Sequence, residues 1–197
     1  MSAYEVMAAT SEALRTILWD SIRLDPVTRA IVNNEATIVF KNPTETMKDN
    51  ANRLSIWLYH VTENEFNKNR PAVRINDTQS RVPPLAVNLY YLITPFARDG
   101  TSDHLLLGKT LEILYDNAIV LLDDGDAIAE ELTITLCRLS LEELTRIWDA
   151  LREPYRLSVC YQVKVARIDS TRANGRARVV RRSHRYGDKG EVEEALA

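Results

Sequence analysis

The chain has 197 residues, of which 45% are hydrophobic and 27% are charged, and its formal net charge is −3. This composition is typical of a globular protein and excludes a disordered or fibrous chain. The length predicts one compact domain, and because no apolar run approaches the roughly 18 residues of a membrane span, we expect no membrane contact.

The N-terminal segment and the cysteines predict the compartment. The first 15 residues carry two glutamates and lack a basic region followed by an apolar one, so we expect no secretory signal and synthesis in the cytoplasm. Two cysteines, Cys137 and Cys160, are too few for a disulfide framework, which favours a reducing environment.

The net charge hides an asymmetry between the body and the tail. Residues 170–197 hold seven basic and four acidic residues, a balance of +3, whereas residues 1–169 hold 18 basic and 24 acidic residues, a balance of −6. We therefore divide the chain into a domain, 1–170, and a basic C-terminal arm, 171–197, which we expect to be extended or partly disordered.

The chain opens with a predicted amphipathic helix over 3–24. Leu14, Leu18 and Ile22 recur every four residues there, as on the buried face of a helix. Asp25 precedes a proline, which disfavours helical backbone and predicts the end of the helix.

Two strands and a long loop follow. The short segment 36–40 predicts a strand. The segment 53–64 predicts a central strand because both of its sides are largely apolar, with Leu54, Ile56, Leu58 and His60 on one side. The polar segment 63–82 has no period and predicts a long loop.

The middle of the chain predicts a strand followed by a helix. The segment 83–97 is apolar on both sides and predicts a second central strand. We expect the helix to take Thr101, Ser102 or Asp103 as its N-cap. Its apolar stripe runs to Leu122, before an aspartate-rich turn.

The last part predicts a strand, a helix and a strand. The segment 131–139 alternates, and Ser140 with Glu143 fits the capping box that begins a helix. The segment 156–168 also alternates, with one polar side, and predicts an antiparallel strand near a sheet edge. The fold class is therefore α/β (α+β), with a mixed, largely antiparallel sheet flanked by helices.

No motif predicts catalysis, a cofactor or a metal. There is no glycine-rich phosphate loop, no CxxC and no HExxH. His60, on an apolar strand, is the best-placed catalytic candidate, but we interpret it as a core or subunit-contact residue, and His104 as a surface or capping residue. The cysteines are interpreted as small buried groups, and the three aspartates of the turn as solvated, namely Asp123, Asp124 and Asp126.

The sharpest compositional signal is a run of arginines without an acid between them: Arg172, Arg176, Arg178, Arg181, Arg182 and Arg185. These six residues are the candidate assembly interface. They could contact an acidic protein surface, including that of a neighbouring copy, or could neutralise nucleic-acid phosphates. They could also form a solvated tail, and aromatic side chains that would stack on bases are scarce there.

Four segments together resemble a known family. They read RLSIWLYHVTEN (53–64), PPLAVNLYYLITPFA (83–97), DHLLLGKTLEILYDN (103–117) and SLEELTRIWDALREPYRLSVCYQVKVARIDS (140–170). Their order and spacing resemble the tail terminator or cap proteins of phage-tail-like extracellular contractile injection systems, such as the Photorhabdus virulence cassettes and the antifeeding prophage. The resemblance covers about residues 5–170, and the last segment is its most specific part.

The resemblance implies a tail-terminator-like fold and a structural, non-enzymatic role without cofactor, substrate or membrane. It implies a homo-hexameric ring that ends the inner tube and sheath, fixes particle length and couples the sheath to the tube. The partners would be other copies of the chain and the tube and sheath subunits. The particle would be assembled in the bacterial cytoplasm and could be released outside the cell.

Possible contacts for such a ring can be assigned as expectations. The strand 156–168, if it lies at an edge, or the arm 171–185 could accept or supply a sheath strand, and the loop 63–82 could contact the tube. The competing classes are a basic-tailed nucleic-acid-binding or assembly adaptor protein, and a hydrolase with a cleft that contains His60 beside a nucleophile.

Overall fold

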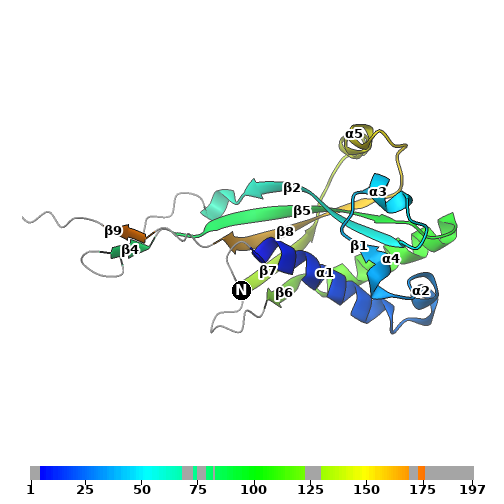
Figure 1. Cartoon of the computed structure of the whole chain (residues 1–197), viewed down its shortest axis with the longest axis horizontal. Coiled ribbons are helices and arrows are strands. Elements are labelled where there is room, and N and C mark those ends of the chain that lie inside the picture. The colour runs from blue at the N-terminus through cyan, green and yellow to red at the C-terminus, as the bar shows by residue number, and fades with distance from the viewer. Residues whose placement is uncertain are drawn as a thin grey trace, which may run out of the picture.

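A six-stranded sheet organises the chain in the order β1-β2-β5-β8-β7-β6 (Figure 1). The strands are β1 (Ile38–Val39), β2 (Leu54–Glu63), β5 (Leu85–Pro95), β6 (Ile119–Leu122), β7 (Glu130–Leu136) and β8 (Val159–Ile168). Only β1 and β2 run parallel, and all other neighbours are antiparallel. The predicted mixed, largely antiparallel sheet is confirmed.

The computed structural model describes most of the chain, namely residues 5–67, 73–74, 79–81, 83–122, 130–168 and 173–175. Five α-helices lie in these ranges: α1 (Val6–Ile22), α2 (Pro26–Ile31), α3 (Pro43–Met47), α4 (Gly100–Asp116) and α5 (Leu141–Leu151). Two short 3-10 helices also lie there, Glu35–Thr37 before β1 and Glu65–Asn67 after β2. No helix in these ranges has the length and apolar character that crossing a membrane requires.

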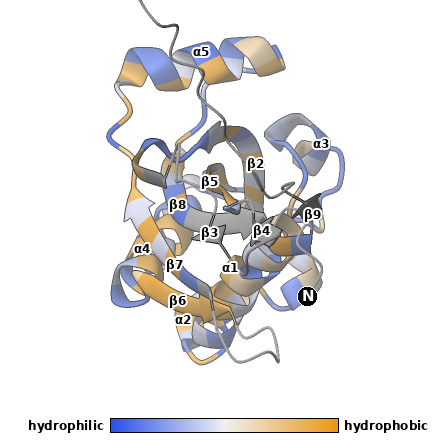
Figure 2. Cartoon of the chain, turned by 90° about the vertical axis from the view of Figure 1, so that its left-hand side faces the viewer, coloured by the Kyte–Doolittle hydropathy of each residue, from blue (hydrophilic) through white to orange (hydrophobic). Residues whose placement is uncertain are grey.

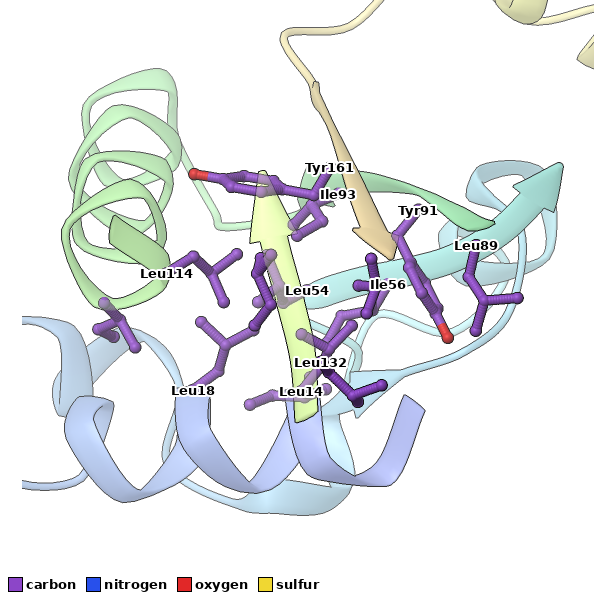
Figure 3. Packing of buried hydrophobic residues seen from close by; sticks show 14 of the residues in the cluster. Leu14, Leu18, Leu54, Ile56, Leu89, Tyr91, Ile93, Leu114, Leu132 and Tyr161 are labelled. Atoms are coloured by element: carbon purple, nitrogen blue, oxygen red, sulfur yellow. The ribbon is translucent and has the colours of Figure 1, made fainter. Parts of the chain in front are cut away.

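Helices α1 and α4 cover one face of the sheet, which we call the inner face. Leu14 and Leu18 of α1 and Leu114 of α4 pack with strand residues such as Leu54 and Ile93 (Figure 3). All five are almost fully buried. The four-residue spacing that predicted the first helix is therefore confirmed, and this packing is the main apolar core of the fold.

The opposite, outer face carries less of the chain. Helix α3 contacts β2 there, where the Ser55 hydroxyl donates to the carbonyl oxygen of Lys41 at 2.7 Å. Helix α5 stands off the sheet on the same side (Figure 1). Residues 137–158, which leave β7, form α5 and return to β8, are called the α5 excursion below.

The segment predicted as one long loop, 63–82, holds more structure than expected. Within it lie β3 (Val73–Arg74) and β4 (Gln79–Arg81), and β4 pairs in turn with β9 (Ala173–Gly175). These strands form a second, three-stranded sheet. Strand β9 lies inside the segment predicted as an arm, and so brings that segment beside the predicted loop.

The predicted N-cap of the middle helix is wrong by two residues or more. Asp99 caps α4, because its carboxylate accepts the Ser102 backbone N–H at 2.9 Å. Ser102 thus supplies the donor and not the cap. Asp103 instead accepts the Ala97 N–H at 2.7 Å, which ties the helix start to the end of β5.

The same helix ends earlier than predicted. The backbone N–H and the side chain of Asn117 both bond to the carbonyl oxygen of Ile113, which closes the last turn. The chain then extends, and the Ile134 N–H donates to the carbonyl oxygen of Ala118 at 2.7 Å. The apolar residues 119–122 therefore form β6 and not a last helical turn.

A bulge in β2 overturns the predicted side for one residue. Leu58 lies opposite Tyr91 but His60 lies opposite Tyr90, so two residues of β2, Tyr59 and His60, face one residue of β5. Such a bulge shifts the alternation by one position. His60 therefore leaves the side of Leu58 and is exposed.

Candidate assembly interface

The open edge of the main sheet is β6. This strand pairs with β7 on one side, and no described strand pairs with its other side. Ile119 and Leu121 are 63% and 64% exposed, whereas Leu122 is buried. An edge strand with unpaired backbone groups and outward apolar side chains is a ready template for another strand. Figure 2 shows the apolar colour of β6 at the surface of the body.

The strand predicted near an edge is central. Strand β8 pairs with β5 on one side and with β7 on the other. The prediction rested on the polar side of its alternation, which side chains of neighbouring strands cover in part. Gln162 donates to the hydroxyl of Tyr90 at 2.9 Å, and the Cys160 sulfur lies 3.1 Å from the Tyr59 hydroxyl. Strand β8 is therefore unavailable for strand addition, while its antiparallel pairing is confirmed.

Aromatic side chains gather on the outer face around the bulge, and we call Trp57, Tyr59, His60 and Tyr90 the aromatic cluster. The ring centroids of His60 and Tyr90 are 5.2 Å apart, and those of Trp57 and Tyr59 are 5.9 Å apart. Burial is the largest cause that raises the pKa of Tyr59. The cluster is half-buried apart from His60. The interpretation of His60 as a core residue is therefore wrong, while a subunit contact stays a prediction.

Helix α5 presents an apolar stripe that the body covers only in part. The predicted capping box is confirmed: the Ser140 N–H donates to the Glu143 carboxylate at 2.8 Å, and the Ser140 hydroxyl accepts the Glu143 N–H at 3.2 Å. Trp148 is 0% exposed and its indole N–H donates to the Ser158 hydroxyl at 3.2 Å. Leu141 is exposed, and three further apolar residues of the helix are only half-buried, namely Leu144, Ile147 and Leu151.

A basic cleft of about 430 Å³ lies at the end of β5, away from the aromatic cluster. Arg53, Arg98 and Arg156 line it, with Asp49 as the acidic neighbour. The Arg156 guanidinium stacks 4.9 Å from the Phe96 ring centre and lies 3.3 Å from the Asp103 carboxylate. His60 does not line this cleft, which leaves the hydrolase interpretation without its expected geometry there.

Several candidates from the sequence lie outside the described residues. These are the six arginines Arg172, Arg176, Arg178, Arg181, Arg182 and Arg185, and the aspartates Asp123, Asp124 and Asp126. His104 is exposed near the start of α4, in agreement with its interpretation as a surface residue. In the described ranges, no group of three or more His, Cys, Asp and Glu side chains gathers as metal ligands would.

Sequence reasoning missed β6, the strand at the open edge of the main sheet. Its signal was the run Ile119 to Leu122 directly after Asn117, since asparagine favours a helix end and β-branched residues favour strands. The run also continued the leucine stripe of the helix before it. Local pattern alone therefore could not separate a last helical turn from an edge strand.

The fold and these surfaces define a mixed α/β protein in which β6 is an open edge of the main sheet and α5 is held off the body. The chain belongs to the Pvc16 N-terminal domain family, whose sequence profile matches residues 9–182. This confirms the resemblance found in the sequence. None of the curated proteins matches the chain.

The chain is similar to solved structures, of which two follow. One is described as the PVC sheath/tube terminator of an extracellular contractile injection system in the extended state, with a TM-score of 0.62 and 18% identity over 95% of this chain and 65% of that one. The other is the tube-terminating cap of the anti-feeding prophage, with a TM-score of 0.46 and 20% identity over 67% of this chain and 48% of that one. The first confirms the tail-terminator-like fold, and this chain spans 65% of that terminator's length.

Proposed function

We propose that the protein is a structural terminator that ends the tube and sheath of a contractile injection particle. Its family membership over residues 9–182 and its likeness in fold to a sheath/tube terminator support this role. The proposed role consists of protein contacts, without a catalytic step. We further propose that the protein is made and assembled in the bacterial cytoplasm, as part of a particle that can be released.

The observation that carries the proposal is the open edge of β6. A sheath subunit at the end of a polymer has lost the neighbour that would receive its connecting segment. That segment can add to β6 as a further strand, bound by main-chain hydrogen bonds and by side chains over Ile119 and Leu121. The terminator would thereby be coupled to the sheath, and it would offer no binding site for a further sheath subunit.

We propose that six copies form a closed ring on the tube. A cyclic ring requires two different surfaces on each subunit, which meet between neighbours. The half-buried stripe of α5 and the aromatic cluster are two such surfaces on the outer side of the sheet. A closed ring satisfies the lateral surfaces of all six copies. It would stop polymerisation and fix the particle length if its face away from the tube offers no binding site for further tube or sheath subunits.

The coupling role is tested by changing β6 alone. In the double variant Ile119→Lys/Leu121→Lys, charges on an edge strand oppose the addition of another strand. The matched control is Leu24→Lys/Val27→Lys, because both residues are exposed, at 75% and 54%, and lie on no strand. We expect sheath capture from co-expressed sheath and tube subunits to fall at least about tenfold for the β6 variant only, which corresponds to about 1.4 kcal/mol.

Electron microscopy of the same particles tests the termination role. Wild-type protein and the control should give tubes of uniform length, and the β6 variant should give tubes of variable length with bare ends. Uniform tubes with the β6 variant would refute the role of this edge. The ring is tested separately by native mass spectrometry, where a six-subunit species is expected and a stable dimer alone would contradict it.

We propose that the arginine-rich arm contacts an acidic surface of a neighbouring copy or of the sheath. The charge split of +3 in residues 170–197 against −6 in residues 1–169 supports this proposal. Removal of residues 176–197 keeps β9 and removes five of the six arginines. Ring formation and tube length should then become impaired, and unchanged rings and tubes would make the arm dispensable.

A further inference from the structure

The two cysteines of the chain, far apart in sequence, meet across neighbouring strands. The β7–β8 ladder places Leu136 opposite Tyr161, and one position further the Cys137 N–H donates to the carbonyl oxygen of Cys160 at 2.8 Å. Opposite residues of an antiparallel pair have Cα atoms about 4.5–5.5 Å apart. This separation is within the range that a disulfide bridges.

The two cysteines occupy facing positions, Cys137 directly after β7 and Cys160 in β8, and the Cys160 thiol contacts Tyr59. The Tyr59 hydroxyl lies 3.1 Å from the Cys160 sulfur. Hydrogen bonds from Cys137 and then Tyr59 lower the pKa of the Cys160 thiol. The bond to Cys160 and burial raise the pKa of Cys137. Cys160 is therefore the first of the pair to become a thiolate.

Access to the pair comes from the side of Cys137. Cys160 is only 3% exposed, whereas Cys137 is half-buried at the start of the α5 excursion. An oxidant from solution thus reaches Cys137 first. The buried Cys160 is the thiol that would then complete the disulfide bond. This division between an accessible and a resolving cysteine is typical of redox-active pairs.

We propose that Cys137 and Cys160 form a reversible disulfide when the protein meets a low-molecular-weight disulfide such as oxidised glutathione. The bond would close the α5 excursion at its base, because residues 138–159, including all of α5, lie between the two sulfur atoms along the chain. Figure 1 shows the two connecting segments that rise from β7 and β8 to α5.

The reaction is balanced by the oxidant. Cys160 first loses its proton to solvent, and its thiolate then accepts the proton of the more accessible Cys137. The Cys137 sulfur attacks one sulfur of glutathione disulfide and releases one glutathione thiolate, which takes up a proton from solvent. The Cys160 sulfur then attacks the Cys137 sulfur of the mixed disulfide and releases the second glutathione. One protein disulfide forms, one glutathione disulfide is reduced to two thiols, and the two protein protons end on those thiols.

Intact-mass spectrometry of the folded, full-length chain tests the proposal with glutathione disulfide as the probe. The wild type should lose about 2 Da, remain monomeric under non-reducing conditions and regain its mass with dithiothreitol. The variant Cys160→Ser should instead hold one glutathione, a gain of about 305 Da, at Cys137. The variant Cys137→Ser should react at least tenfold more slowly.

Three results would overturn the proposal. These are two unreacted thiols in the wild type, two stable glutathione adducts on one chain, and a disulfide between two chains. Hydrogen exchange of the oxidised and reduced wild type then tests the effect on α5. Amides of 141–151 should exchange several-fold more slowly after oxidation, and equal exchange would refute the closure of the excursion.

Discussion

The hydroxyl groups of Ser11 and Tyr91 lie 2.9 Å apart and join helix α1 to the central strand β5. Tyr91 is fully buried, and Ser11 also donates to the carbonyl oxygen of Met7 at 3.1 Å. The Tyr91 ring points from the inner face toward the helix (Figure 3). This polar contact within an apolar core sets the position of α1 along the sheet, since a shifted helix would leave the buried Tyr91 hydroxyl without this partner, while Ser11 would keep its bond to Met7.

Removing either hydroxyl should weaken the fold by a similar amount. Tyr91→Phe and Ser11→Ala should each lower the free energy of unfolding by about 1 kcal/mol, and the double variant by less than their sum. Urea denaturation followed by circular dichroism measures all three values. Tyr115→Phe, at a residue that is 83% exposed, should change stability by less than about 0.5 kcal/mol. Strict additivity would show that the two hydroxyls are not coupled.

The same tyrosine should make stability fall at alkaline pH. Burial raises the pKa of Tyr91 from 10.0 to about 12. Because the folded-state pKa is above the unfolded value, its contribution is complete below pH 10 and is lost as the pH rises toward 12. Urea midpoints across this range should fall more steeply for the wild type than for Tyr91→Phe, and parallel curves would contradict the assignment.

Trp148 should hold the α5 excursion together. Trp148→Ala should cost about 3–5 kcal/mol by emptying a fully buried site, and Trp148→Phe less, because it loses the bond to Ser158 but keeps an aromatic ring. Leu141→Ala, in the same helix but 66% exposed, is the matched control. Hydrogen exchange of α5 reports these changes, and equal exchange in Trp148→Ala and the control would refute the anchoring role.

The capping box should make α5 sensitive to acid. Hydrogen bonds from the backbone and then the side chain of Ser140 lower the pKa of Glu143 in the folded protein. The stabilisation is therefore present above the ordinary glutamate pKa and is lost as the pH falls through the lowered folded-state value. The hydrogen-exchange rates of α5 amides, corrected for intrinsic rates, should rise in acid for the wild type. They should rise less for Glu143→Gln, because the glutamine side chain can accept the Ser140 hydrogen bond but does not titrate.

The features that follow from neighbouring residues were predictable from the sequence. The spacing of Leu14, Leu18 and Ile22 predicted α1 because one turn of a helix brings them to one side. The capping box of Ser140 and Glu143 predicted the start of α5 because both bonds close within three residues. Each feature needs no knowledge of the remaining fold.

The features that failed depend on distant partners. The polar side of β8 looked solvated in the sequence, but Gln162 and Cys160 bond to tyrosines of β5 and β2. His60 changed sides because Tyr59 and His60 together face one residue of another strand. The end of α4 at Asp116 was missed because residues 119–122 pair with β7, which comes later in the chain. Pairing across the sheet decided all three outcomes.

The two edges of the main sheet are unequal in the described part of the chain. At one edge, β1 is a parallel strand of two residues, which is too short to bind a further strand by backbone hydrogen bonds. At the other end β6 presents four residues with its outer side open. If a strand adds to β6 as proposed, the main sheet of each copy takes up one further strand. The number of strands bound at this edge would then equal the number of copies in the assembly, whatever its symmetry.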